Sequence, residues 1–327
     1  MDFALSEEQA ELAATVRGLL EKRADSAAVR AASTSPTGHD EALWATLCEQ
    51  IGVAALAVPE EYDGVGATFF ETAVVLEELG RSLAPSPLLA TTVATQALLA
   101  GGTDEAKQRL LPRIAAGEVA TVLLDAGPVL DGDRASIVLA VIGDELVEVA
   151  DAPATWAESM DQSVRLARLD LTVATTTPLG DGTAAGARAE LVGAASVAAL
   201  AVGLADRALR MTVDYSRDRV QFGRPIGSFQ ALKHRMADVF ARTEMARSAS
   251  WAASYALAEG ADDADFLTRA AAAYAIETAQ LAASECVQLH GGIAITWEHD
   301  AHLVFKRAHA LGQLYGAPHR HRAAVAL

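Results

Sequence analysis

The chain has 327 residues, of which 51% are hydrophobic, 5% are aromatic and 21% are charged. This length and apolar content allow a large buried core in two or three structural units. The formal net charge of −17 argues against nucleic acid and anionic membranes as partners, because both attract surfaces rich in lysine and arginine. The two cysteines lie far apart in the sequence, so we expect free thiols in a reducing cytoplasm rather than a disulfide framework.

The first part of the chain is expected to be mainly helical. Ser6 is a suitable N-cap for a helix over residues 6–31. Asp40 is suited to cap a second helix, which carries apolar residues at helical spacing. Turn-rich loops separate further helices, and the last of these follows Thr103, another capping residue. We therefore predict an N-terminal helical domain over residues 1–119.

The composition changes at residue 120. Three stretches, at 120–125, 136–150 and 164–175, are rich in β-branched and aliphatic residues. They are bounded or interrupted by Gly-Pro, Gly-Asp and Asp-Gly pairs, which are typical of turns. We therefore predict a small β domain over residues 120–180.

Helical periodicity returns in the C-terminal part, residues 181–327. We expect helices at residues 187–217, 229–259, 262–290 and about 298–315. Long helices joined by short loops form a bundle. The most apolar stretch, at 191–205, is shorter than the ~18–20 residues of a membrane span and is followed at once by charged residues. We therefore expect no membrane partner.

The sequence RVQFGRPIGSFQ, residues 219–230, joins two of these helices. Arg219 carries a guanidinium group, whose forked donors suit the oxygens of a pyrophosphate. Gly223 allows a tight turn of the backbone. Taken alone, the stretch is also compatible with an ordinary helix–turn–helix corner that carries a surface arginine.

A second motif, QLHGG, occupies residues 288–292. Gly291 and Gly292 allow the backbone to lie against a ligand, and their N–H groups are able to bind phosphate. A His-Gly-Gly sequence is, however, also common at the C-terminal end of a helix.

Together the two motifs resemble the cofactor-contacting segments of the acyl-CoA dehydrogenase family. The order and spacing of IGVAALAVPEEYDGVG and EELGR near the N-terminus resemble the same family. The resemblance implies a mainly α fold with a small β domain: an N-terminal helical domain, a reduced middle β domain and a C-terminal four-helix bundle. It also implies FAD as the cofactor. A neighbouring subunit holds most of this FAD, and the present chain contacts its adenosine diphosphate half. The residues implied in this contact are Arg219, Phe222, Phe229, Gln230, Gln288, Gly291 and Gly292.

The catalytic base of the family is missing from the positions where the resemblance places it. Removal of a proton from the acyl α-carbon requires a carboxylate within hydrogen-bond reach. Most members carry it in a Tyr-Glu-Gly-Thr stretch, but here Gly316 follows Tyr315. A few members carry it early in the C-terminal domain, at the position of Gly193. Glu190, one helical turn earlier, is the remaining candidate, and the alternative is a solvated glutamate in the first turn of a helix.

The middle domain departs from the family as well. It lacks the Thr-Glu-Pro-x-x-Gly-Ser and Trp-Ile-Thr segments that hold the flavin ring and the acyl chain in full-length members. We therefore predict a subunit similar to the short, base-lacking chains of actinobacterial steroid catabolism, which pair with a full-length subunit as α2β2 heterotetramers. The resemblance implies a bulky, steroid-derived acyl-CoA substrate and an electron-transfer flavoprotein as acceptor.

Two alternatives stay open. In the first, the chain is a self-sufficient homomeric dehydrogenase that uses Glu190. In the second, it is a non-catalytic paralogue that serves as a binding or structural protein. No metal site is predicted, because no cysteine or carboxylate set completes the C-terminal histidines. We expect these histidines to form a basic tail or a subunit contact; they are His299, His302, His309, His319 and His321.

Overall fold

The computed structural model describes residues 4–325 of the chain. The chain forms two compact units. The bundle unit comprises Met1–Ser26, Leu76–Leu83 and Ala194–Leu327, and the sheet unit comprises Ala27–Val75 and Ala84–Gly193. Helices α4 (Phe69–Ser82) and α7 (Gly182–Asp218) contribute residues to both units.

Two helices of the sheet unit, α3 and α6, begin directly after predicted capping residues. They are α2 (Ser26–Ser33), α3 (Glu41–Thr46) with the π-helical turn η1 (Leu47–Ile51), η2 (Glu60–Tyr62), the first part of α4, α5 (Leu88–Gly101) and α6 (Asp104–Ala115). The carboxylate of Asp40 accepts a hydrogen bond from the N–H of Leu43 at 3.0 Å. The hydroxyl of Thr103 accepts one from the N–H of Ala106 at 3.2 Å. Both predicted caps are confirmed, and each satisfies a donor that the first helical turn leaves free.

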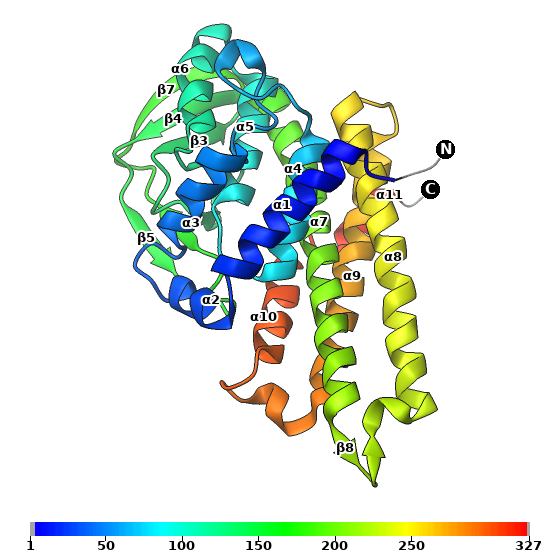
Figure 1. The fold of residues 1–327 in the computed structure, drawn as a ribbon. Helices are drawn as coiled ribbons and strands as arrows, with labels where there is room; N and C mark the ends of the chain where they lie inside the picture. The colour runs from blue at the N-terminus through cyan, green and yellow to red at the C-terminus, as the bar shows by residue number, and fades with distance from the viewer. Residues whose placement is uncertain (1–3, 326–327) are drawn as a thin grey trace. The chain divides into compact units, whose positions relative to one another are not determined.

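The strands of the sheet unit form two small sheets (Figure 1). The four-stranded sheet has the order β1-β3-β4-β7, and the three-stranded sheet has the order β2-β6-β5. The strands are β1 (Ala120–Leu123), β2 (Val129–Leu130), β3 (Ile137–Ile142), β4 (Glu145–Ala150), β5 (Ala154–Ala157), β6 (Leu166–Leu169) and β7 (Thr175–Asp181). β1 and β3 run parallel, whereas the other neighbours are antiparallel. Alternating residues of these strands, among them Leu123, Ala140 and Val147, form a buried apolar cluster.

The bundle unit is built from helices, and the longest of them lie side by side (Figure 1). They are α1 (Glu7–Arg23), the main part of α7, α8 (Gln230–Glu259), α9 (Ala264–His290), α10 (Ala301–Leu311) and α11 (Pro318–Val325). α9 packs against α8, α10 and α11 and is therefore the central helix of this group. The mainly α fold with a small β region confirms the predicted fold class.

Glycine allows α4 and α7 to approach closely inside the bundle unit. A Cβ atom on Gly203 would overlap the carbonyl oxygen of Glu77, and one on Gly80 would overlap that of Leu200. α7 is long and apolar enough to cross a membrane, but 83% of its most apolar window is buried inside the fold. It is therefore a core helix that packs through small residues.

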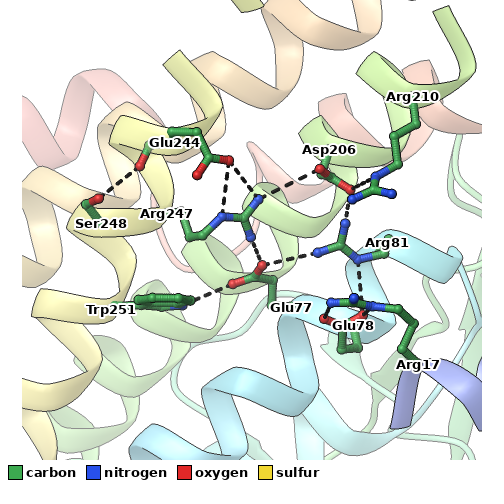
Figure 2. A network of polar contacts seen from close by, with 10 residues as sticks. All are labelled: Arg17, Glu77, Glu78, Arg81, Asp206, Arg210, Glu244, Arg247, Ser248 and Trp251. Atoms are coloured by element: carbon green, nitrogen blue, oxygen red, sulfur yellow. Dashed lines mark hydrogen bonds and ion pairs between the residues drawn. The ribbon is translucent and has the colours of Figure 1, made fainter. Parts of the chain in front are cut away.

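Buried ion pairs connect four helices of the bundle unit (Figure 2). Arg247 of α8 pairs with Glu77 of α4, and Arg81 of α4 pairs with Asp206 of α7. Arg17 of α1 reaches Glu78 at 2.7 Å, and the indole N–H of Trp251 donates to Glu77 at 3.1 Å. Because charges this deeply buried need partners, the network fixes how the four helices pack.

Three expectations about the helices are wrong. The helix predicted over residues 6–31 is two helices, because α1 ends at Arg23 and α2 begins at Ser26; Asp25 and Ser26 are both residues that favour helix starts. α7 begins at Gly182 rather than at residue 187, and α11 was not predicted. Strand β5 also lies outside the stretches that were predicted as β.

Candidate cofactor-binding surface

The first motif forms a β-hairpin at the end of α7 (Figure 1). Strands β8 (Val220–Gln221) and β9 (Arg224–Pro225) are joined by Phe222 and Gly223, whose φ angles are 54° and 78°. Two central residues with positive φ define the tight turn that suits a two-residue hairpin. Positive φ strains a phenylalanine, yet Phe222 is 92% exposed. The hairpin therefore holds an aromatic ring out into solvent at a conformational cost.

The residues that follow the hairpin bring the rest of the first motif together. Phe229 is the N-cap residue of α8, and Gln230 is its first residue. The ring of Phe229 lies edge-on to that of Phe222, with centroids 6.1 Å apart, and the Arg224 guanidinium lies 4.0 Å from its centre. The side chains of Arg219, Phe222 and Gln230 are all exposed. The predicted residues of the first motif thus lie in the hairpin and at the start of α8, beside the positive end of a helix dipole.

The second motif forms the end of α9. Gln288 is exposed in the last turn, and the chain leaves the helix at Gly291 with φ 67° and ψ −144°, a conformation that is essentially restricted to glycine. A Cβ atom on Gly292 would meet no atom within 4 Å, so packing within the chain does not require a glycine there. The two exposed glycines leave their backbone open to a group outside the chain.

A ring stack joins the two motifs. Tyr215 lies one helical turn before Arg219. The backbone carbonyl oxygen of Tyr215 accepts a hydrogen bond from the backbone N–H of Arg219 at 2.8 Å. The ring of His290, in the second motif, stacks on that of Tyr215 with centroids 4.4 Å apart. The structure therefore places the predicted segments next to each other. Neither the role of Tyr215 nor the stack was predicted, although the spacing of four residues between Tyr215 and Arg219 puts both on one helical face.

The protonation of His290 follows from its contacts. Nδ1 lies 2.7 Å from the carbonyl oxygen of Cys286. A carbonyl only accepts, so Nδ1 carries the proton. Burial lowers the pKa of His290, and the ring is therefore neutral at pH 7. A neutral ring stacks on Tyr215 without placing a charge in the buried interior.

The positions of the expected base hold no carboxylate. Gly193 is a buried residue of α7, and Gly316 has φ 110°. A Cβ atom on Gly316 would lie 2.9 Å from the ring of His321. His321 is 3% exposed, and burial lowers its pKa. The predicted basic tail is therefore wrong for His321, whose buried ring occupies the space next to the position of the family's base.

Glu190 lies on the sheet-unit part of α7 and is exposed. Because α7 begins at Gly182, Glu190 stands about two turns inside the helix. Its interpretation as a first-turn glutamate is therefore wrong. Glu190 belongs to the sheet unit, whereas both motifs belong to the bundle unit.

Known proteins resemble this chain over nearly its whole length. The sequence model of the acyl-CoA dehydrogenase N-terminal domain matches residues 6–118, and that of the C-terminal domain matches residues 180–326. Acyl-CoA dehydrogenase IpdE2 of Mycolicibacterium smegmatis is 45% identical over 96% of each chain. The protein of the same name from Mycobacterium tuberculosis is 46% identical over 95% of this chain and 94% of that protein.

Solved structures show the same fold. A variant of the Tcur3481-Tcur3483 steroid acyl-CoA dehydrogenase is 29% identical, with a TM-score of 0.88 over 98% of this chain and 96% of that one. The ChsE4-ChsE5 complex from Mycobacterium tuberculosis has a TM-score of 0.86 over 99% and 98% of the two chains, at 24% identity. Strands β1 to β6 lie between the two matched domains.

Proposed function

Because this chain belongs to the acyl-CoA dehydrogenase family, we propose that it is one subunit of a heteromeric enzyme. The family consists of oxidoreductases that use FAD. The proposed reaction is α,β-desaturation of a bulky, steroid-derived acyl-CoA thioester. The observation that supports a subunit role is the absence of a carboxylate at Gly316 and Gly193, combined with intact cofactor motifs.

In this proposal the chain completes the adenosine diphosphate side of an FAD site. The guanidinium of Arg219 binds the pyrophosphate, because its forked donors match paired anionic oxygens. The exposed amides of Gln230 and Gln288 and the open backbone at Gly291 and Gly292 supply further hydrogen bonds. Phe222 and Phe229 supply apolar surface. When bound, FAD accepts a hydride from the β-carbon of the substrate.

The proposed partner is a full-length acyl-CoA dehydrogenase subunit in an α2β2 heterotetramer. It supplies the flavin-ring pocket and the catalytic glutamate, both of which this chain lacks. Two structural neighbours, the Tcur3481-Tcur3483 steroid enzyme and the ChsE4-ChsE5 complex, are each named for two proteins, which favours a heteromer. The first of these neighbours is a steroid enzyme by name, which favours the proposed substrate class. An electron-transfer flavoprotein as acceptor and a cytoplasmic location are part of the same proposal.

Co-expression with a full-length acyl-CoA dehydrogenase from the same organism tests the proposal. Flavin absorbance per chain and the mass of the complex are measured, and the same data are collected for this chain alone. We expect a colourless single chain and a yellow complex with FAD shared between the two subunits. A yellow, active homomer would instead support the alternative base Glu190. No flavin in either preparation would leave a non-catalytic binding protein.

A further inference from the structure

Exposed apolar side chains gather on the part of the chain that carries the two cofactor motifs. Among residues 4–325, fourteen large hydrophobic side chains are exposed, and nine of them lie within residues 220–297. Isolated exposed apolar residues are normal on a protein surface, whereas a contiguous group marks an interaction site. Four of the nine lie on the long helices α8 and α9. Whether these four form a contiguous group depends on how the two helices are paired.

α8 and α9 run antiparallel and side by side in a fixed register. A short turn joins them, and they pack against each other along their length. In the first part of α8, Nε of Arg235 lies 2.6 Å from Oε2 of Glu285 in α9. Further along, the hydroxyl of Tyr274 donates to Sδ of Met245 at 3.6 Å. These two contacts fix which residues of the helices lie level with each other, so the outward sides of both helices form one surface.

This surface, the α8–α9 face, consists of the outward residues within 230–255 and 266–288. The large apolar side chains on it are, with their exposed fractions, Phe240 (57%), Met245 (61%), Tyr255 (52%) and Phe266 (52%). At about 100° per residue, the three on α8 lie within less than half of the helix circumference, and the register places Phe266 level with Tyr255. The exposed Ala241 lies on the same arc of α8. Large and small residues thus alternate in ridges and grooves, which suit the packing of another helix.

The α8–α9 face is large enough for a stable subunit contact. From Gln230 to Tyr255 it is about 38 Å long, at about 1.5 Å per residue, and two packed helices make it about 20 Å wide. Its area is therefore roughly 760 Å², and a standard protein–protein interface buries about 800 Å² on each partner. A contact of this size would cover the large apolar side chains that the single chain leaves exposed.

Both cofactor motifs lie at one end of the α8–α9 face. Gln230 is the first residue of α8, and Gln288 lies in the last turn of α9, so the antiparallel arrangement brings them to the same end. If the proposed function holds, a neighbouring subunit brings its FAD to this end and lies next to the face. A second copy of this chain would bring no flavin-ring pocket, because the chain lacks the segments that form one. We propose that the α8–α9 face binds an apolar helical surface of the full-length acyl-CoA dehydrogenase subunit that holds this FAD.

Methionine oxidation tests the proposal without altering the chain. Met245 and Met160 are 61% and 55% exposed, but Met160 lies in the sheet unit and serves as the internal control. The deflavinated co-expressed complex and the chain alone are treated with hydrogen peroxide, and sulfoxide formation is followed by mass spectrometry. We expect assembly to slow the oxidation of Met245 by about tenfold or more, because access of the oxidant controls the rate, and to leave Met160 unchanged. Equal rates at Met245 in both samples would overturn the proposal, and protection in an oligomer of this chain alone would assign the face to a second copy instead.

A pair of matched substitutions tests the energetic role of the contact. Met245→Glu still offers an acceptor to the hydroxyl of Tyr274, but it places a charge on the α8–α9 face. We expect it to raise the dissociation constant of the flavin-free complex at least about tenfold, as at the centre of an interface, whereas Met160→Glu should leave it unchanged. Sedimentation of the complex gives the constants, and thermal unfolding of each variant chain alone shows that it folds.

The assembly assay separates this inference from the proposed function, because it needs neither flavin nor turnover. A complex that forms and responds to Met245→Glu but binds no FAD would contradict the proposed function and support the contact. A complex that binds FAD and is as stable with Met245→Glu as with the wild-type chain would overturn this inference alone. A wild-type chain that assembles with no full-length subunit would overturn both.

Discussion

The ring of His290 stacks on the ring of Tyr215 at a centroid distance of 4.4 Å and an interplanar angle of 28°. This contact fastens the end of α9 to the end of α7, and with them the two motifs that are proposed to bind FAD. The ring of His299 also contacts the ring of His290, with the two ring centroids 4.5 Å apart. The contacts between these rings thus hold the segments 219–230 and 288–292 next to each other. The geometry of the proposed cofactor surface depends on these contacts.

Replacing Tyr215 therefore tests whether the stack positions the surface. We expect Tyr215→Ala to weaken FAD binding by the co-expressed complex by about tenfold, because misplacing one segment loses its contacts. Tyr215→Phe keeps the ring and should bind FAD as the wild type does. Fluorescence titration of the deflavinated complex with FAD gives both affinities. Equal losses in the two variants would show that the hydroxyl, and not the stack, is what matters.

Arg219 has a matched control two residues away. Arg217 lies in the last turn of α7, is exposed, and is 3.7 Å from Asp214. If Arg219 binds the pyrophosphate, Arg219→Ala should weaken FAD binding about ten- to a hundredfold, as the loss of a charge-assisted bidentate contact predicts. Arg217→Ala removes the same charge and should change the affinity little. A similar loss in both variants would indicate a general electrostatic effect instead of a specific contact.

Restoring the glutamate at Gly316 should not create a catalytic base. The φ of 110° favours glycine, and the ring of His321 lies where a side chain would start. We expect Gly316→Glu to lower the free energy of unfolding by about 1–3 kcal/mol and to give no activity when the partner's own base is removed. Thermal unfolding and turnover measure the two effects. Activity in that complex would show that the local backbone rearranges to accept the side chain.

Local signals in the sequence predicted local structure well. Asp40 and Thr103 were recognised as caps because capping depends on one side chain and the next three residues. The stretch from Arg219 to Gln230 was singled out because, together with residues 288–292, it resembles the cofactor-contacting segments of the acyl-CoA dehydrogenase family. The fold class followed from the change of periodicity at residue 120 and its return after residue 180.

Contacts between distant residues were not predictable in the same way. Gln96 and Arg188 are far apart in sequence, and no pattern in either segment indicates that they meet. His321 was expected to lie in a basic tail or a subunit contact, but packing within the chain buries it. Burial of such polar residues is decided by what the rest of the fold places around them, which a single sequence does not display.

The buried ion pairs of the bundle unit predict a large effect of removing one member. Arg247 is 13% exposed and pairs with Glu77, which is 7% exposed (Figure 2). Arg247→Met leaves Glu77 with fewer compensating charges, so we expect the free energy of unfolding to fall by about 3–5 kcal/mol. Arg217→Met, at an exposed pair, should change it little. Chemical denaturation of both variants measures these changes. Equal denaturation midpoints for Arg247→Met and Arg217→Met would mean that the network adds no net stability.

Asp131 predicts how stability depends on pH. It is 7% exposed and adopts a φ of 53°. Burial raises the pKa of Asp131 to about 7 from 3.8; repulsion by Asp133 adds to the rise, and Arg165 opposes it. At pH values between these two pKa values, the folded protein binds more protons than the unfolded chain. The free energy of unfolding should therefore fall as the pH rises from about 4 to about 7. Above pH 7 the full penalty of ionising the buried carboxyl applies.

Asp131→Asn removes the ionisation and keeps a residue that tolerates positive φ. We expect this variant to be more stable than the wild type at pH 8, by at most about 4 kcal/mol at ~1.4 kcal/mol per pH unit, and equally stable at pH 4. Asp151→Asn is the matched control, because Asp151 also has a positive φ, of 59°, but is exposed. Denaturation at several pH values gives the two curves. Parallel curves for wild type and Asp131→Asn would show that Asp131 keeps an ordinary pKa through contact with Arg165.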